Sequence, residues 1–319
     1  MKNFALIGIA GYIAPRHLKA IKDTGNRLVA SLDKSDSVGI IDSYFPEADF
    51  FTEFERFDRH LEMLRRKEPE KAVHYVSICS PNYLHDAHCR FALRIGADAI
   101  CEKPVVLNPW NIDALQEAEQ EYGHKIYSVL QLRLHPEIIK LKHKIEHNQT
   151  NKIYDIDLTY ITARGRWYFY SWKGIEDKSG GIATNIGVHF FDMLSWIFGP
   201  PTLNIVHLRR PDVAAGYLEL KRARVRWFLS LRFEDLPQES LLAGKRSYRR
   251  IKIDGEPFDF TDGFQDLHTR VYEEVLKGNG FGLEENRDAI QIVYDIRHAE
   301  IKPNMGEHHP LFAKIWHQL

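Results

Sequence analysis

The sequence predicts an α/β protein of two domains. A doubly wound parallel sheet is expected in the N-terminal part, and an α+β domain with a large, mostly antiparallel open sheet in the C-terminal part. In the first 130 residues, short apolar runs alternate with helical patterns, which is typical of βαβ units. After Leu132, longer alternating strands follow one another without helices between them. We therefore expect a first domain over residues 1–130 and a second over residues 131–319.

The first domain is expected to contain short strands separated by helices. The strands are predicted at 4–7, 28–32, 50–51, 73–78, 97–101 and 125–130. The helices are predicted at 14–24, 38–45, 57–67, 83–95 and 108–122. In such a sheet the carboxyl ends of the strands meet at one edge, where ligands bind.

The second domain is expected to combine longer strands with helices that cover one face of their sheet. Its strands are predicted at 153–162, 203–209, 215–221, 223–233 and 247–253. Its helices are predicted at 136–147, 182–198, 267–277 and 286–301.

The composition is that of an ordinary globular protein. The chain is 44% hydrophobic and 27% charged with a formal net charge of −1, so nothing favours nucleic acid as a partner. No apolar stretch approaches the ~20 residues of a membrane span, and the start of the chain carries no signal-peptide pattern. Cys79, Cys89 and Cys101 have no metal-ligand spacing, so we expect reduced packing residues in a cytoplasmic protein.

A glycine-rich loop follows the first predicted strand and opens the first helix. Gly8 permits a tight turn, and Gly11 lets backbone N–H groups approach a pyrophosphate at the helix N-terminus. Tyr12 and Ile13 complete this candidate dinucleotide loop. The spacing is looser than G-x-G-x-x-G, so a plain turn between strand and helix is the alternative.

Further candidate cofactor contacts follow the second and fourth predicted strands. Asp33 lies 22 residues after the second loop glycine, where a carboxylate can accept both hydroxyls of an adenosine ribose. The same charge repels a 2′-phosphate, which favours NAD over NADP, although Lys34 is adjacent. Ser80, Asn82 and His85 leave the fourth strand at the same edge, with a capped turn as the alternative.

The tripeptide Glu102-Lys103-Pro104 follows the fifth predicted strand. The ammonium of Lys103 can hold a substrate hydroxyl, or remove its proton once desolvated, and Pro104 can fix the backbone through a cis peptide bond. A strand-end turn is the alternative for this tripeptide taken alone. We count Lys103 as a candidate catalytic and cofactor-binding residue, and Glu102 as a candidate cofactor contact.

Three polar residues interrupt an otherwise apolar predicted helix. Asn185, His189 and Asp192 are spaced i, i+4 and i+7, so we expect them on one helical face as candidate catalytic residues. A neutral histidine is a natural proton acceptor near pH 7, which the oxidation of an alcohol requires. A buried core histidine is the alternative, and Lys103 is the second candidate base. No metal is expected, because the chain has neither H-E-x-x-H nor a cysteine cluster.

Taken together, these stretches resemble the glucose-fructose oxidoreductase and inositol dehydrogenase (Gfo/Idh/MocA) family over essentially the whole chain. The resemblance rests on the loop at Gly8, on Asp33, on Ser80-Pro81-Asn82 with His85, on Glu102-Lys103-Pro104 and on residues 180–192. It implies an N-terminal Rossmann domain and a C-terminal α/β domain whose open sheet often packs in oligomers. The implied activity is NAD(P)-dependent oxidation of a ring hydroxyl on a sugar or cyclitol.

The chain departs from the family pattern at one position. Many members carry Asp four residues before the histidine, whereas this chain has Asn185. An amide can orient the imidazole ring but supplies no compensating charge. Asn185 therefore weakens the case for His189 as the base, compared with the family pattern, and strengthens the case for Lys103.

Three stretches are similar to the bacterial UDP-N-acetyl-2-amino-2-deoxyglucuronate dehydrogenases of this family. They are residues 11–17 (GYIAPRH), 164–168 (RGRWY) with 171–174 (SWKG), and 266–272 (DLHTRVY). The similarity implies oxidation of a UDP-sugar, UDP-N-acetylglucosaminuronic acid, at C3 for 2,3-diacetamido sugar and lipopolysaccharide synthesis. It also implies tightly held NAD and, in some cases, recycling of NADH by 2-oxoglutarate. We further expect a homo-oligomer, specifically a tetramer.

Two alternatives to this activity remain open at the level of sequence. One is a dehydrogenase of another sugar or cyclitol, and the other is a non-catalytic NAD(H)-binding regulator on the same fold. The presence of both Lys103 and His189 favours an enzyme.

Basic and aromatic side chains are the candidate substrate contacts, beside Lys103, Asn185 and His189. Arginine binds carboxylates and phosphates through two parallel hydrogen bonds, and aromatic faces suit a sugar or uracil. The candidates are Arg133, Arg164, Arg166, Lys173, Trp167, Tyr168 and Trp172. A basic, aromatic loop at a subunit contact is the alternative explanation.

Overall fold

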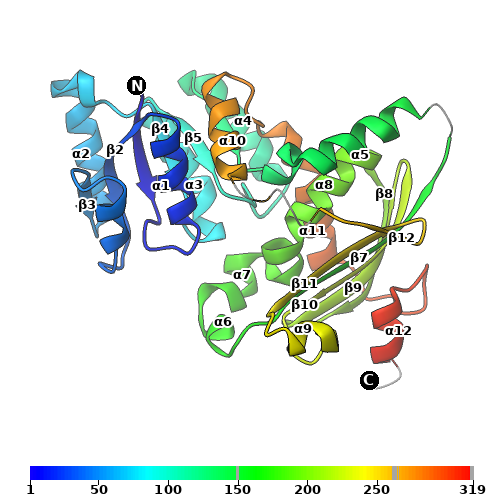
Figure 1. Ribbon diagram of the computed structural model, residues 1–319. Helices are drawn as coiled ribbons and strands as arrows, with labels where there is room; N and C mark the ends of the chain where they lie inside the picture. The colour runs from blue at the N-terminus through cyan, green and yellow to red at the C-terminus, as the bar shows by residue number, and fades with distance from the viewer. Residues whose placement is uncertain (149–150, 261–263, 265, 317–319) are drawn as a thin grey trace. The chain divides into compact units, whose positions relative to one another are not determined.

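The computed structural model describes the chain except residues 149–150, 261–263, 265 and 317–319, and it divides into two units (Figure 1). The first unit comprises Met1–Leu134 and Gly263–Arg287, and the second comprises His135–Asp262 and Asp288–Leu319. The predicted border near residue 130 is close to this division. The prediction that all of 131–319 forms the second domain is wrong for the segment that ends at Arg287, because Val271, Tyr272 and Val275 pack in the core of the first unit.

The first unit contains a sheet of six parallel strands. The strands are β1 Asn3–Ile7, β2 Arg27–Leu32, β3 Asp49–Phe51, β4 Tyr75–Ile78, β5 Asp98–Cys101 and β6 Ile126–Ser128. Their order is β3-β2-β1-β4-β5-β6, with every pair parallel. This order is that of a doubly wound sheet, so the predicted class of the first sheet is confirmed.

The helices of the first unit follow the predicted pattern with one exception. They are α1 Ala14–Asp23, α2 Phe54–Lys67, α3 His85–Arg94, α4 Trp110–Tyr122 and α10 Leu267–Leu276, with 3₁₀ turns η1 Gly39–Ser43, η2 Pro69–Lys71, η3 Asn82–Leu84, η4 Gln131–Leu134 and η7 Glu284–Asn286. The helix expected at 38–45 is only the 3₁₀ turn η1. Glycine, β-branched residues, Asp and Ser in that stretch are poor helix formers, which explains the difference.

The second unit is built on a mixed sheet. Its strands are β7 Tyr154–Thr162, β8 Pro201–Arg209, β9 Val213–Leu220, β10 Ala223–Ser230, β11 Ser247–Ile253 and β12 Glu256–Phe258, in the order β12-β11-β7-β10-β9-β8. Only β7 and β10 pair in parallel among these strands, and the other pairs are antiparallel. The prediction of a mostly antiparallel open sheet is therefore confirmed.

Helices lie on both faces of this second sheet (Figure 1). The helical segments are α5 Pro136–His147, α6 Trp167–Tyr170, η5 Trp172–Gly174, α7 Glu176–Ser179, the π-helical turn η6 Ala183–Gly187, α8 Val188–Phe198, α9 Gln238–Leu242, α11 Arg287–His298 and α12 Pro310–Trp316. Phe191 of α8 packs on Trp227, whereas Phe312 of α12 joins the cluster around Phe228. Because neighbouring residues of a strand point to opposite faces, α8 and α12 cover opposite sides of the sheet.

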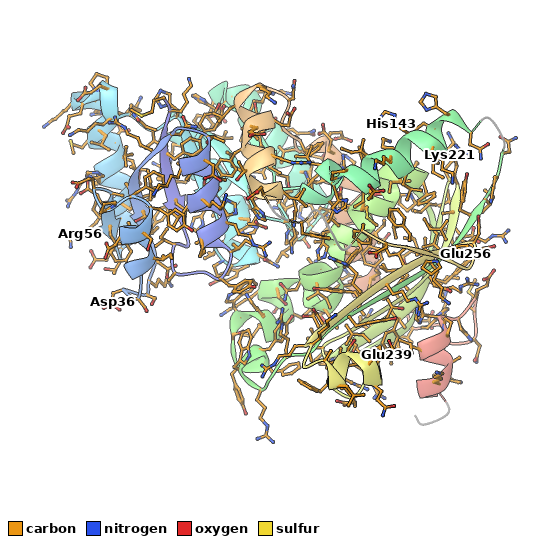
Figure 2. All side chains as sticks on the ribbon, in the orientation of Figure 1. Asp36, Arg56, His143, Lys221, Glu239 and Glu256 are labelled. Carbon is orange, nitrogen blue, oxygen red and sulfur yellow. The ribbon has the colours of Figure 1, made fainter. Side chains whose placement is uncertain are left out.

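Charged side chains of both signs are spread over the two units (Figure 2). Asp36 and Arg56 are exposed on the first unit, and Lys221 and Glu256 on the second. This mixture is consistent with the near-zero net charge of the sequence. Within the described part of the chain, no helix has the length and apolar character needed to cross a membrane.

Candidate active site

The ends of four neighbouring strands are aligned in the first unit. Ile7 pairs with both Leu32 and Ile78, and Ile78 pairs with Cys101. Each of these is the last residue of its strand, so the segments that follow begin side by side along one edge of the sheet. The prediction that the glycine loop, Asp33, the residues after β4 and the Glu102-Lys103-Pro104 segment share one edge is therefore confirmed.

The glycine loop needs its first glycine for two independent reasons. Gly8 has a φ of +90°, and a Cβ placed there would lie 2.6 Å from the carbonyl carbon of Cys79. Gly11 is also confined, since a Cβ there would lie 3.0 Å from the carbonyl oxygen of Gly8. The loop is thus pressed against the end of β4, and helix α1 begins immediately after it at Ala14.

Asp33 is fixed beside this loop. Its Oδ2 accepts a hydrogen bond from the amide of Ala10 at 3.0 Å, and its Oδ1 accepts one from the amide of Ser35 at 2.9 Å. Each carboxylate oxygen has a second lone pair, so two ribose hydroxyls can still be bound. Tyr12, the next residue after Gly11, is 90% exposed. A tight glycine turn, a helix N-terminus and a partly exposed carboxylate fit the pyrophosphate and ribose of NAD.

The candidate residues after β4, Ser80, Asn82 and His85, are all buried. His85 is buried, and its Nδ1 and Nε2 lie 2.7 Å and 2.8 Å from the carbonyl oxygens of Pro104 and Ser80. The Ser80 hydroxyl contacts Nδ1 of His88 at 2.8 Å, and Asn82 is buried at the start of η3. The prediction that the His85 side chain contacts the cofactor is therefore not supported, because this ring joins two backbone segments.

Lys103 follows β5 and is only partly exposed. Its peptide bond to Pro104 is cis. Burial lowers the pKa of Lys103, while the neighbouring carboxylate of Glu102 acts in the opposite direction. A lysine in this state supplies more of the neutral amine near neutral pH than an exposed lysine does, as a general base requires.

Glu102 lies in a buried polar cluster instead of at an open surface. Its Oε1 is 3.0 Å from Nε2 of His17 and 3.0 Å from Nε2 of His268. The prediction of Glu102 as a direct cofactor contact is therefore corrected, because its exposed fraction is 7% and its oxygens are engaged internally. The donor atoms of the three residues lie within 4.8 Å of one another, a spacing that a metal ion could also use, but hydrogen bonds already account for it.

In the second unit, the three polar residues of the apolar helix do not share a regular α-helix. Asn185 lies in the π-helical turn η6, whereas His189 and Asp192 lie on α8. The one-face prediction assumed a uniform helical repeat, and it holds only for the i, i+3 pair on α8. Asp192 is buried, while Asn185 and His189 are partly exposed. The side chain of Asn185 donates to the hydroxyl of Tyr168 at 2.5 Å.

The candidate substrate residues of the loop around residues 164–173 and Arg133 differ in exposure. Arg164, Arg166 and Trp167 are exposed, Trp172 and Lys173 are partly exposed, and Tyr168 and Arg133 are buried. Lys173 lies with its Nζ 3.9 Å from the ring centre of Trp172.

Tyr168 is 2% exposed, and burial raises the pKa of its hydroxyl. The prediction that its ring offers a flat face for a ligand is corrected, because the ring is buried and its hydroxyl accepts a hydrogen bond from Asn185. Arg133 is also buried: it lies over the ring of Phe281 and donates to the carbonyl of Glu285 at 2.7 Å. In this position Arg133 contacts residues of its own unit, and a substrate contact of Arg133 stays a prediction.

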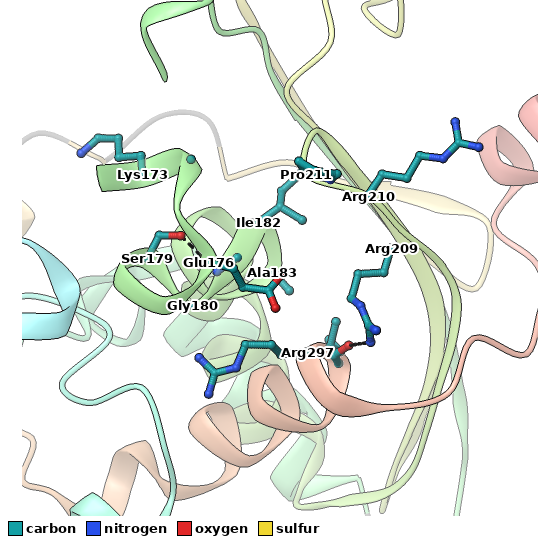
Figure 3. Close-up of a pocket in the computed structure, with 13 residues that line it drawn as sticks. Lys173, Glu176, Ser179, Gly180, Ile182, Ala183, Arg209, Arg210, Pro211 and Arg297 are labelled. Carbon is teal, nitrogen blue, oxygen red and sulfur yellow. Dashed lines mark hydrogen bonds between the residues drawn. The ribbon is translucent and has the colours of Figure 1, made fainter. Parts of the chain in front are cut away.

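A pocket in the second unit adjoins the segment that leads into η6 (Figure 3). Lys173, Gly180, Ile182 and Arg297 contribute to its lining. Arg209 also points into it, and its guanidinium donates to the carbonyl oxygens of Ile296 and Ala299 at 2.9 Å and 2.8 Å. Of the predicted substrate residues only Lys173 lines this pocket, and neither His189 nor Asn185 does.

Comparison with known proteins identifies the family to which this chain belongs. Residues 2–130 match the NAD-binding Rossmann domain of the Gfo/Idh/MocA oxidoreductase family, and residues 142–238 match its C-terminal alpha/beta domain. The chain belongs to this family, and its first unit carries the NAD-binding Rossmann fold.

Particular relatives are similar over different lengths. The WlbA (WbpB) dehydrogenase from Thermus thermophilus, solved with NAD and alpha-ketoglutarate, is 52% identical with a TM-score of 0.92, covering 97% of this chain and 99% of that one. The same dehydrogenase solved with NAD and UDP-GlcNAcA is 51% identical with the same coverage and TM-score. The D-glucoside 3-dehydrogenase of Escherichia coli is 26% identical over 41% of this chain and 38% of its own length. The chain spans about half the length of the curated relatives it matches, or less.

Proposed function

We propose that the protein oxidises the C3 hydroxyl of UDP-N-acetylglucosaminuronic acid to the 3-keto sugar with NAD as cofactor. The observation that carries this proposal is the 51% identity, over 97% of the chain, to a dehydrogenase solved with NAD and UDP-GlcNAcA. The glycine loop and Asp33 support the choice of NAD, because Asp33 keeps acceptor capacity for ribose hydroxyls and would repel a 2′-phosphate.

The reaction needs a proton acceptor for the C3 hydroxyl, and NAD when bound supplies the acceptor for the C3 hydride. We assign the proton to Lys103 or His189. Lys103 is favoured by its lowered pKa, and His189 by its partly exposed ring on α8. The side-chain amide of Asn185, which is held by its hydrogen bond to the Tyr168 hydroxyl, can orient a ligand. This amide carries no charge, so it cannot stabilise an imidazolium as a carboxylate would.

Recognition of the acidic nucleotide sugar is assigned to the exposed basic and aromatic segment of the second unit. Arg164 and Lys173 suit the uronate carboxylate or the diphosphate, since both ligand groups are anionic. Trp167 and Trp172 provide ring faces for the uracil or the sugar.

A substrate panel tests the proposed activity. Purified protein with NAD is mixed with UDP-N-acetylglucosaminuronic acid, UDP-N-acetylglucosamine, free N-acetylglucosaminuronic acid or myo-inositol, and formation of reduced nicotinamide is followed by absorbance. Rapid reduction with the first compound alone supports the proposal. Faster reduction with myo-inositol or a free sugar would assign the protein to another sugar or cyclitol, and no reduction with any compound would favour a non-catalytic regulator.

A second proposed activity is recycling of the reduced cofactor by 2-oxoglutarate. It is favoured by the 52% identical Thermus thermophilus dehydrogenase, which was solved with NAD and alpha-ketoglutarate. Catalytic amounts of NAD should then support many turnovers when 2-oxoglutarate is present, with one 2-hydroxyglutarate formed per keto sugar. A single turnover per bound NAD, with no 2-hydroxyglutarate, would contradict recycling.

The cellular setting follows from the proposed substrate. We place the protein in the cytoplasm as a homotetramer that supplies a keto sugar for lipopolysaccharide synthesis, where an aminotransferase can consume the new carbonyl. Sedimentation equilibrium of the purified chain gives the oligomeric state directly, and a monomer or dimer would contradict the tetramer.

A further inference from the structure

A buried chain of hydrogen bonds runs behind the Glu102-Lys103-Pro104 segment of the first unit. Ser77 Oγ on β4 contacts Tyr272 Oη on α10 at 2.6 Å, and Tyr272 Oη contacts His17 Nδ1 on α1 at 2.7 Å. His17 Nε2 and His268 Nε2 both reach Glu102 Oε1 at 3.0 Å. These hydrogen bonds therefore join β4 and the segment after β5 to α1 and α10, whose residues His17 and Tyr272 are 255 positions apart in the sequence.

The positions of the protons in this chain follow from its partners. Burial alone raises the pKa of Glu102, but the hydrogen bonds from the two histidines hold it well below its usual range, so Glu102 is a carboxylate and accepts. Burial lowers the pKa of His17, so its ring is neutral with the proton on Nε2. Its Nδ1 then accepts from the Tyr272 hydroxyl, which in turn accepts from Ser77. Each of these donors is thus oriented toward Glu102.

The oriented carboxylate is connected to Lys103. The amide of Lys103 donates to Glu102 Oε2 at 3.3 Å, and the same carboxylate counteracts the effect of burial on the Lys103 ammonium. On the other side of the segment, His85 contacts the carbonyl of Pro104 at 2.7 Å, and its pKa is lowered by burial and, to a smaller extent, by the Lys103 ammonium. The segment that carries Lys103 is therefore anchored on both sides by buried side chains.

We propose that His17, His268 and Tyr272 are positioning residues for Lys103, which they control by holding Glu102 as a fixed, ionised carboxylate. The inference rests on the proposed function, because it assigns this network to the activity of Lys103. It also gives a role to α10, whose segment belongs to the first unit although it follows the second sheet in sequence.

A matched pair of substitutions at His268 tests the proposal. His268→Gln keeps an N–H donor near the position of Nε2, whereas His268→Leu has a similar volume and no donor. Losing a hydrogen bond to a charged group should lower kcat about tenfold or more in His268→Leu, and His268→Gln should recover most of that loss. NAD affinity, measured by fluorescence titration, should change by less than about threefold in both variants. Equal kcat values in the two variants would overturn the proposal.

The pH profile provides a readout that a purely structural role would not move. His268→Leu removes one of the two histidine donors, so the pKa of Glu102 rises and its carboxylate, held less firmly beside Lys103, counteracts the effect of burial on the ammonium less. The limb of the kcat/KM profile that reports Lys103 should therefore move to lower pH in His268→Leu and remain in place in His268→Gln. An unchanged profile in His268→Leu would contradict the proposed control of Lys103.

A measurement on the unmodified protein separates this inference from the proposed function. Nitrogen-15 NMR of labelled histidines, with His17 assigned by substitution, should show a neutral ring protonated on Nε2 at pH 7 to 8. A charged ring, or a proton on Nδ1, would overturn the network. Wild-type turnover in a Lys103→Met variant would instead overturn the catalytic role of Lys103 and leave the proton order of the network intact.

Discussion

At Lys103, burial and a neighbouring carboxylate act on one ammonium group in opposite directions. Burial is the larger influence, so the pKa of Lys103 lies below its ordinary value of about 10.4. The deprotonated amine is then available at lower pH than for an exposed lysine. If this amine is the base, the rate should rise with pH through the lowered pKa of Lys103 and level off above it.

Replacing Lys103 with Met removes the amine and keeps an unbranched side chain of similar length. We expect kcat to fall by about 10²–10⁴, the range typical of a lost general base, while NAD still binds. Steady-state kinetics and fluorescence titration of NAD measure the two effects. Lys67→Met, an exposed lysine of the same unit, is the control and should retain the wild-type rate.

His189 provides the second test of where the proton goes. His189→Ala should also lower kcat by about 10²–10⁴ without loss of NAD binding, because the ring is the other candidate acceptor. The relative size of the two losses, measured with the same substrate, separates the base from a residue that only orients the hydroxyl. Near-wild-type rates in both the Lys103 and His189 variants would contradict the assignment of the proton to either residue.

A substitution at Gly8 is expected to affect both the stability of the protein and its binding of NAD. Ala at this position combines a positive φ with a Cβ only 2.6 Å from the backbone of Cys79, so the loop must move away from β4. We expect Gly8→Ala to weaken NAD binding at least tenfold and to lower the Tm. Gly25→Ala is the matched control, because Gly25 also has a positive φ of +71° but no atom within 4 Å of its Cβ position. The control should lose only about 1–2 kcal/mol and keep its affinity for NAD.

At the scale of elements, two helices show how distant segments complete each unit. α10 places Tyr272 in the core of the first unit, where its ring stacks on that of Phe4 with 5.7 Å between the ring centres. In the second unit, α12 buries Phe312 completely against the sheet, in the cluster of Ile161, Ala215 and Phe228. A buried aromatic side chain therefore contributes to the packing of each of these late helices, beside Val271 and Val275 on α10.

Replacing Phe312 with Ala should release α12 from the sheet. Removing a fully buried Phe costs about 3–5 kcal/mol, because the transfer of the ring and the cavity both contribute. Urea denaturation of the variant should show this loss in the transition that reports the second unit. Lys314→Ala, an exposed position on the same helix, should change stability by less than about 0.5 kcal/mol. A loss of equal size in both variants would show that α12 is stabilised along its whole length and not by Phe312.

For the whole molecule, local sequence pattern was sufficient for the first sheet and for the second sheet except its short strand β12, but not for long-range contacts. Apolar runs predicted every strand of the first sheet, since a buried parallel strand requires them. The membership of α10 in the first unit depends on where Tyr272 packs, which no local pattern records. The buried partners of Glu102 and His85 were missed for the same reason, although His17 and His268 both lie in stretches that resembled the family. The π-helical turn at Asn185 also escaped, because the residue spacing was interpreted with a regular helical repeat.

Buried neutral histidines in both units predict how stability depends on pH. Burial lowers the pKa to about 4 for His88 in the first unit and for His309 in the second, where His309 contacts the Thr159 hydroxyl at 3.0 Å. In the unfolded chain each has a pKa of about 6.5, so between pH 6.5 and 4 the unfolded state binds more protons than the folded state. The contribution of each histidine to the free energy of unfolding is therefore fully present above about pH 6.5. It is lost as the pH falls toward 4, and the loss is about 3 kcal/mol per histidine.

Substitution of these histidines measures that contribution. Urea denaturation at several pH values should show a steeper loss between pH 6.5 and 4 in the wild type than in His309→Gln, which keeps a polar side chain but has no proton to gain. His308→Gln, at the exposed neighbouring position, should keep the wild-type dependence. Identical slopes in the wild type and His309→Gln would show that the carboxylates, and not this histidine, set the acid sensitivity of the second unit.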